Sequence, residues 1–114
     1  MEREILYLMS NQAYFETLQS VAYGSITSSY TAVGTQYTNA LRVFRAVNAT
    51  NGDLFITWDP TRNQMFLPAN SFVLYDVEAN SAFNEQLKVH GYSQLWVKYS
   101  SSPTSGSLYL EAIS

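Results

Sequence analysis

Short runs of β-branched and aromatic residues, separated by turn residues about every ten positions, dominate the chain from residue 41 onward. Valine, isoleucine, threonine and the aromatic residues favour strands, and regular spacing of short strands is typical of a sandwich or barrel. In residues 41–47 apolar and polar positions alternate imperfectly, because Arg45 falls on the same side as Val43 and Val47. The alternation nevertheless predicts a strand there.

The expected strands share this pattern and end at glycine, proline, asparagine or aspartate. They are residues 15–23, 25–30, 41–47, 54–58, 64–67, 71–77, 87–90, 94–99 and 108–113. Asn51-Gly52 is a strong hairpin signal, because both residues tolerate positive φ. Asp59-Pro60 predicts a second turn. Residues 100–106 are small and polar, and we expect them to form the exposed tip of a final hairpin.

These elements predict an all-β fold, an antiparallel β-sandwich of the jelly-roll or immunoglobulin-like type with about seven or eight strands. A chain of 114 residues has the length of one domain. We therefore expect a single sandwich over residues 16–114, preceded by an N-terminal arm over residues 1–15. The expected core residues are Leu41, Val43, Val47, Phe55, Trp58, Phe72, Leu74, Leu95, Val97, Leu108 and Leu110.

The arm differs from the rest of the chain because its composition favours helix, yet it would form only two or three helical turns. So short a helix is marginal alone and gains order by docking. We expect its large apolar side chains to contact another subunit, whereas the alternative is that Leu6 and Met9 fold back over the open end of their own sandwich. The predicted contact residues are Ile5, Leu6, Tyr7, Leu8, Met9, Tyr14 and Phe15.

Charge and composition restrict the possible partners. Only 13% of the residues are charged, so part of the surface is expected to be covered by other subunits unless it is simply neutral and polar. The net charge is −3 and the six basic residues are scattered, which argues against nucleic-acid binding. The apolar run near the N-terminus is too short to be a signal sequence or to span a membrane, so no membrane partner is expected.

No pattern in the sequence indicates catalysis, a cofactor or a metal. The chain has no cysteine and a single histidine, His90, and no Gly-x-Ser-x-Gly motif that would present a nucleophile. Four acidic residues are expected on loops or strand ends, but their spacing does not match a calcium loop; they are Asp53, Asp59, Asp76 and Glu78. Trp58 and Trp96 fall inside expected strands, which favours the core over an exposed stacking platform.

Several segments resemble small virion proteins of tailed bacteriophages. They are residues 25–35, 42–57, 67–76 and 97–110, and the resemblance covers roughly residues 20–113. The shared features are turns and strands rather than catalytic motifs.

The resemblance implies a β-sandwich subunit of the virion, made in the host cytoplasm and present in many copies. It implies a capsid decoration or cement protein that binds the major capsid protein, or a head–tail neck, connector or tail component that binds neck or tail subunits. In either place a homo-oligomer is expected. A receptor- or glycan-binding sandwich is the alternative of another class, and it would present aromatic side chains on one flat face.

Overall fold

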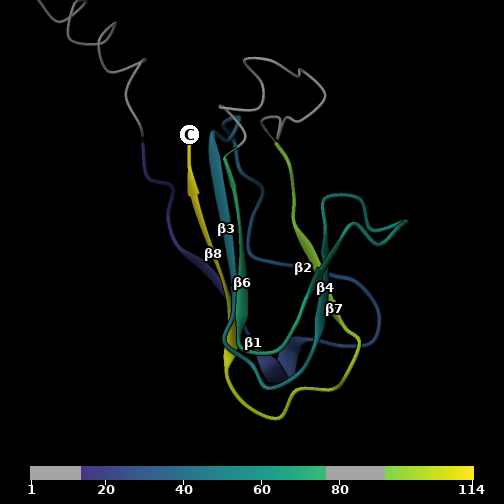
Figure 1. Cartoon of the computed structure of the whole chain (residues 1–114). Helices are drawn as coiled ribbons and strands as arrows, with labels where there is room; N and C mark the ends of the chain where they lie inside the picture. The colour runs from purple at the N-terminus through teal and green to yellow at the C-terminus, as the bar shows by residue number, and fades with distance from the viewer. Residues whose placement is uncertain (1–13, 77–91) are drawn as a thin grey trace, which may run out of the picture.

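A computed structural model describes residues 14–76 and 92–114, and these residues form two antiparallel four-stranded sheets. Sheet A has the order β1-β8-β3-β6 and sheet B the order β2-β7-β4-β5. Figure 1 shows the two sheets as separate layers, with β1, β3, β6 and β8 in one and β2, β4 and β7 in the other. The predicted all-β sandwich is confirmed.

The strands are short and alternate in exposure, as expected for two sheets that share one core. In sheet A they are β1 (Gln19–Ala22), β8 (Ser107–Ile113), β3 (Val43–Asn48) and β6 (Ser71–Asp76). In sheet B they are β2 (Thr31–Ala32), β7 (Trp96–Tyr99), β4 (Leu54–Thr57) and β5 (Met65–Leu67). One turn of 3₁₀ helix, η1 (Tyr23–Ser25), follows β1.

The core lies between the sheets and is built from the inward-facing residues of both. The buried apolar residues include Leu41, Leu95, Val97, Leu108 and Leu110, which confirms five of the predicted core positions. Val43, Val47, Phe55 and Trp58 are half-buried. The remaining buried apolar residues are Ile26, Val33, Tyr37, Phe44, Ala46, Leu54, Ile56, Leu67 and Ala112.

Two predicted core residues, Phe72 and Leu74, are wrong, because they are 58% and 57% exposed. The face of β3 was also assigned in the wrong sense: Phe44 and Ala46 point into the core, and Arg45 points outward. Both sides of β3 and β6 carry apolar residues, so alternation alone does not say which side faces the other sheet. Arg45 decides the matter physically, since a guanidinium is rarely buried without a partner.

Two predicted hairpins are also wrong. The Asn51-Gly52 turn joins β3 in sheet A to β4 in sheet B, and residues 100–106 join β7 in sheet B to β8 in sheet A. Both segments therefore cross between the layers. They pack against each other: the Asn51 side chain both donates to and accepts from Thr104, with distances of 2.7 Å. The crossing places Pro103 in a buried position.

The Asp59-Pro60 turn does join two neighbouring strands of one sheet, β4 and β5. Near the N-terminus only Gln19–Ala22 of the expected strand 15–23 is regular, and residues 25–30 contain no strand. The expected strand 87–90, with His90, lies outside the described residues. So do residues 1–13 of the predicted arm.

Candidate interaction face on sheet A

The register of sheet A collects apolar side chains on the side that faces away from the core. Arg45 lies opposite Leu74 on one neighbouring strand and Glu111 on the other. Val47 lies between Phe72 and Tyr109 in the same way, and Val43 lies between Asp76 and Ile113. We call this surface the outer face; with Leu18 it comprises Leu18, Val43, Arg45, Val47, Phe72, Leu74, Asp76, Tyr109, Glu111 and Ile113.

The outer face exposes large apolar groups to solvent. Leu18, Phe72 and Leu74 are each more than half exposed, and Tyr109 is 37% exposed. An antiparallel sheet that faces water on one side usually carries polar residues there. Contiguous apolar surface on a folded domain commonly marks a site of contact with another molecule.

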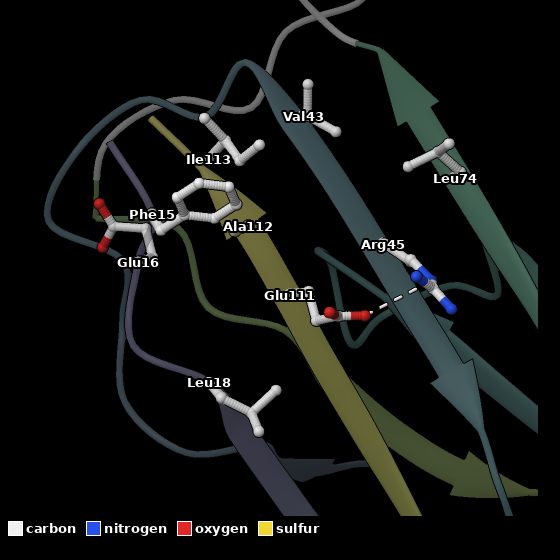
Figure 2. A pocket seen from close by; sticks show the side chains of 9 residues that line it. All are labelled: Phe15, Glu16, Leu18, Val43, Arg45, Leu74, Glu111, Ala112 and Ile113. Carbon is white, nitrogen blue, oxygen red and sulfur yellow. Dashed lines mark ion pairs between the residues drawn. The ribbon is translucent and has the colours of Figure 1, made fainter. Parts of the chain in front are cut away.

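A shallow groove with a volume of about 400 Å³ crosses one end of the outer face. Figure 2 shows Phe15, Ile113 and Val43 at one end of this groove, Leu18 on β1's side and Leu74 on β6's side. The other lining residues are Glu16, Arg45, Glu111 and Ala112. Aliphatic and aromatic side chains therefore form most of the groove wall. Its charged residues are Glu16 and the Arg45–Glu111 pair, which joins β3 to β8.

The charged groups of the outer face interact with one another. Arg45 Nε lies 3.4 Å from Glu111 Oε1, and both side chains remain about half exposed (Figure 2). The Arg45 guanidinium also lies 5.0 Å from the centroid of the Phe72 ring, a distance suited to a cation–π contact. Because these charges neutralise each other, the centre of the face presents little net charge to a partner.

The chain reaches the outer face at Tyr14 and Phe15, the two predicted contact residues that the structure describes. Phe15 forms an antiparallel bridge with Ile113, and Tyr14 and Ser114 exchange two backbone hydrogen bonds of 3.0 and 2.9 Å. Their side chains are 65% and 77% exposed, respectively. The other predicted contact residues, Ile5, Leu6, Tyr7, Leu8 and Met9, lie outside the described residues.

Sequence reasoning missed the outer face as a contact surface, because it assigned Val43, Val47, Phe72 and Leu74 to the core. Residues 72–75 contain four consecutive apolar residues, Phe-Val-Leu-Tyr, which place apolar groups on both sides of a strand. That run was the available signal, since a strand with one side in water should alternate.

Two of the acidic residues that were considered as metal ligands, Asp53 and Asp59, hold turns in place through hydrogen bonds. Asp59 Oδ1 accepts hydrogen bonds from the backbone N–H and the hydroxyl of Thr61, and these bonds lower the pKa of Asp59. Asp53 Oδ1 accepts a hydrogen bond from the Ala69 N–H. Within residues 14–76 and 92–114, no three His, Cys, Asp or Glu side chains gather at one place. Glu78 lies outside these ranges.

Trp58 packs edge to face against Phe44 and is tilted relative to Tyr37. Trp58 lies 5.0 Å from Phe44 and 6.4 Å from Tyr37 between ring centroids, so it belongs to the core periphery rather than to a stacking platform. Trp96 is half-buried. Burial raises the pKa of Tyr37 to about 12, with a smaller contribution from the Glu16 carboxylate. In the described part of the chain no helix is long and apolar enough to cross a membrane.

Comparison with known proteins gives one structural similarity. No protein-family model matches the sequence, and no curated protein matches it. Among solved structures, the fold is similar to the crystal structure of SPP1 Dit (gp 19.1), described as a paradigm of the hub adsorption apparatus in phages that infect Gram-positive bacteria. The TM-score is 0.42 at 10% sequence identity, over 90% of this chain and 48% of that chain, so this chain spans about half the length of the protein that it matches.

Proposed function

We propose that the chain is a non-enzymatic structural protein of a bacteriophage virion, which joins neighbouring subunits through the outer face of sheet A. The observation that carries this proposal is the exposure of Leu18, Phe72 and Leu74 on one side of a sheet that would otherwise face water. Burial of one such side chain contributes about 1.5–3 kcal/mol. A partner that covers several of them would therefore be bound more tightly.

The composition of the face supports a protein partner. Three adjacent strands, β8, β3 and β6, present it together with Leu18, and its central charges form an ion pair with each other. Interfaces that persist in assemblies are enriched in apolar and aromatic groups, and such groups surround the ion pair of this face. The resemblance of residues 20–113 to small virion proteins of tailed phages supplies the class of assembly.

Two placements in the particle are compatible with this role: decoration or cement on the capsid, and the neck or tail. In the first, the partner is the major capsid protein, and in the second it is a neck or tail subunit. Mass spectrometry of purified particles of the phage that encodes the chain, after heads and tails are separated, tests both. Peptides of the chain in several copies per particle are expected in one fraction, and their absence from both would refute a virion role.

Glycan binding is a second candidate because Phe72 and Tyr109 flank Val47 on the outer face. Sugar recognition also needs polar groups that bond hydroxyls, and the charged groups at the centre of the face, Arg45 and Glu111, already form an ion pair with each other. We therefore rank protein contact first. A glycan array probed with the purified chain separates the two: specific binding that Phe72→Ala removes would favour the glycan-binding role.

A further inference from the structure

We propose that the outer face of sheet A is the docking site for residues 1–13 of a second copy of this chain. This inference deepens the proposed function, because it names the occupant of the face. It rests on three observations: the apolar character of the groove, the point at which residues 1–13 join the sheet, and the sequence of those residues.

The groove requires an uncharged, apolar occupant. Phe15, Leu18, Val43, Leu74 and Ile113 supply its carbon walls. Arg45 and Glu111 already form an ion pair with each other, so a charged side chain of the occupant would gain little at the centre of the face. Within residues 1–13, positions 5–9 are Ile-Leu-Tyr-Leu-Met and carry no charge, whereas Glu2, Arg3 and Glu4 precede them.

The direction of the chain at Tyr14 favours a second copy over the chain's own face. The Glu16 N–H donates to the Ala112 carbonyl, and Tyr14 pairs with Ser114, so the chain followed backward from Glu16 runs along β8 toward its end. Figure 1 shows this segment beside β8 at the end of sheet A where the C-terminus lies. The chain therefore enters Tyr14 from beyond the last backbone pair, and a return of residues 1–13 to the same face would require the chain to reverse its direction.

The length of the segment is sufficient for exchange between copies. Thirteen residues span up to about 43–47 Å when extended. The two outer strands of a four-stranded sheet lie only about 14–15 Å apart. A segment of this length can leave its own sheet and still cross the whole outer face of a neighbour. Whether such a segment docks as an extended strand or as a helix, several of its apolar side chains can enter the groove.

Disulfide trapping tests the exchange cleanly because the chain contains no cysteine. Full-length chains with a single cysteine at Leu6→Cys or Leu8→Cys are mixed with isotopically labelled Leu74→Cys chains and oxidised. The matched control is Phe66→Cys, an apolar residue that is similarly exposed but lies on sheet B. A double variant, Leu8→Cys with Leu74→Cys, reports on docking within one chain.

The expected result is a labelled–unlabelled disulfide dimer with Leu74→Cys that exceeds the Phe66→Cys dimer by about tenfold, since docking raises the local concentration of the two thiols. Equal yields at the two positions would overturn the proposal. So would an intramolecular disulfide in the double variant without dimers in the mixtures, which would place the segment on its own face. Each result is independent of particle composition, so peptides of the chain in purified virions would still support the structural role if exchange fails.

Discussion

The Asn48 side-chain amide in β3 donates a 3.0 Å hydrogen bond to the Leu67 carbonyl in β5, so one buried polar group links the two sheets. The same amide donates to the carbonyl oxygens of Gly52 and Pro68, and its oxygen accepts from the Thr50 N–H and hydroxyl. Asn48 and Thr50 are fully buried. This network lies where three loops that cross between the sheets meet, residues 49–53, 68–70 and 100–106.

We expect Asn48→Ala to lower the free energy of unfolding by about 2–3 kcal/mol, because it leaves buried carbonyl and N–H groups without partners. Asn63→Ala is the matched control: the Asn63 side chain accepts one exposed hydrogen bond from Tyr30, and its loss should change stability by less than about 0.5 kcal/mol. Urea unfolding followed by tryptophan fluorescence measures both. Equal effects of the two substitutions would show that the network does not link the sheets.

Gly106→Ala should destabilise the sandwich strongly. Gly106 has φ +88°, and a Cβ there would lie 2.0 Å from the Ala49 carbonyl oxygen, which is backbone and cannot move aside easily. The backbone strain alone is expected to cost about 1–3 kcal/mol. Gly24→Ala is the control, since a Cβ at Gly24 meets no atom within 4 Å. Thermal unfolding should separate the two variants by several degrees, and similar melting temperatures would contradict the packed crossing at Gly106.

An insertion after Ser102 is expected to destabilise the protein, contrary to the expectation from sequence. Pro103 is buried, and Asn51 holds Thr104 through two hydrogen bonds of 2.7 Å. The same peptide inserted between Arg62 and Asn63, in the exposed turn after β4, should be tolerated because that turn joins two neighbouring strands of one sheet. Yields of folded protein and melting temperatures compare the two. Tolerance at both sites would show that the packing of residues 100–106 contributes little.

The contrast between these two turns explains how far sequence reasoning reached. Local signals identified most strands, because β-branched runs and turn residues act over a few positions. They did not reveal which strands share a sheet: Asn51-Gly52 satisfies the chemistry of a tight hairpin but joins the two layers. That choice depends on long-range packing, which no local pattern encodes.

The candidate face was missed for a related reason. Phe72 and Leu74 are apolar and lie in a strand, so burial was the natural expectation. Val73 and Tyr75 on the other side of β6 are also apolar, and only the pairing of Leu74 with Arg45 shows which side faces outward. A strand with two apolar sides predicts a second contact surface once the core side is known.

Stability is expected to fall as the pH rises above about 10, in part through Tyr37. Burial raises the pKa of Tyr37 to about 12, above the value of 10.0 expected in the unfolded chain. The unfolded state therefore loses this proton first, so the contribution is complete below pH 10 and is lost as the pH rises toward 12. Burial also raises the pKa of Tyr30, which adds to the alkaline loss.

Tyr37→Phe should reduce this alkaline loss without destabilising the protein at pH 7. The Tyr37 hydroxyl is buried and, within the described residues, has no hydrogen-bond partner, so its removal sacrifices no bond there. Denaturant midpoints of both proteins between pH 7 and pH 12 make the comparison. An unchanged pH dependence in Tyr37→Phe would show that other tyrosines account for the loss, and a large loss at pH 7 would reveal a bond from the hydroxyl.

Leu74→Ser should weaken association between subunits while leaving the fold intact. The Leu74 side chain is 57% exposed and lies outside the core, so its truncation should change the free energy of unfolding by less than about 1 kcal/mol. In this variant a partner that covers the groove loses apolar contact with Leu74. In an assembly with many identical interfaces, the losses at the separate interfaces add up. Phe66→Ser on sheet B removes an aromatic group of comparable exposure and should leave association unchanged. Sedimentation velocity over a range of concentrations measures association, and circular dichroism confirms the fold.

If Phe66→Ser rather than Leu74→Ser dissociates the oligomer, the contact surface lies on sheet B. If the parent chain remains a monomer at every concentration, the outer face is not an interface between copies, and the contacts proposed for it must come from other virion proteins.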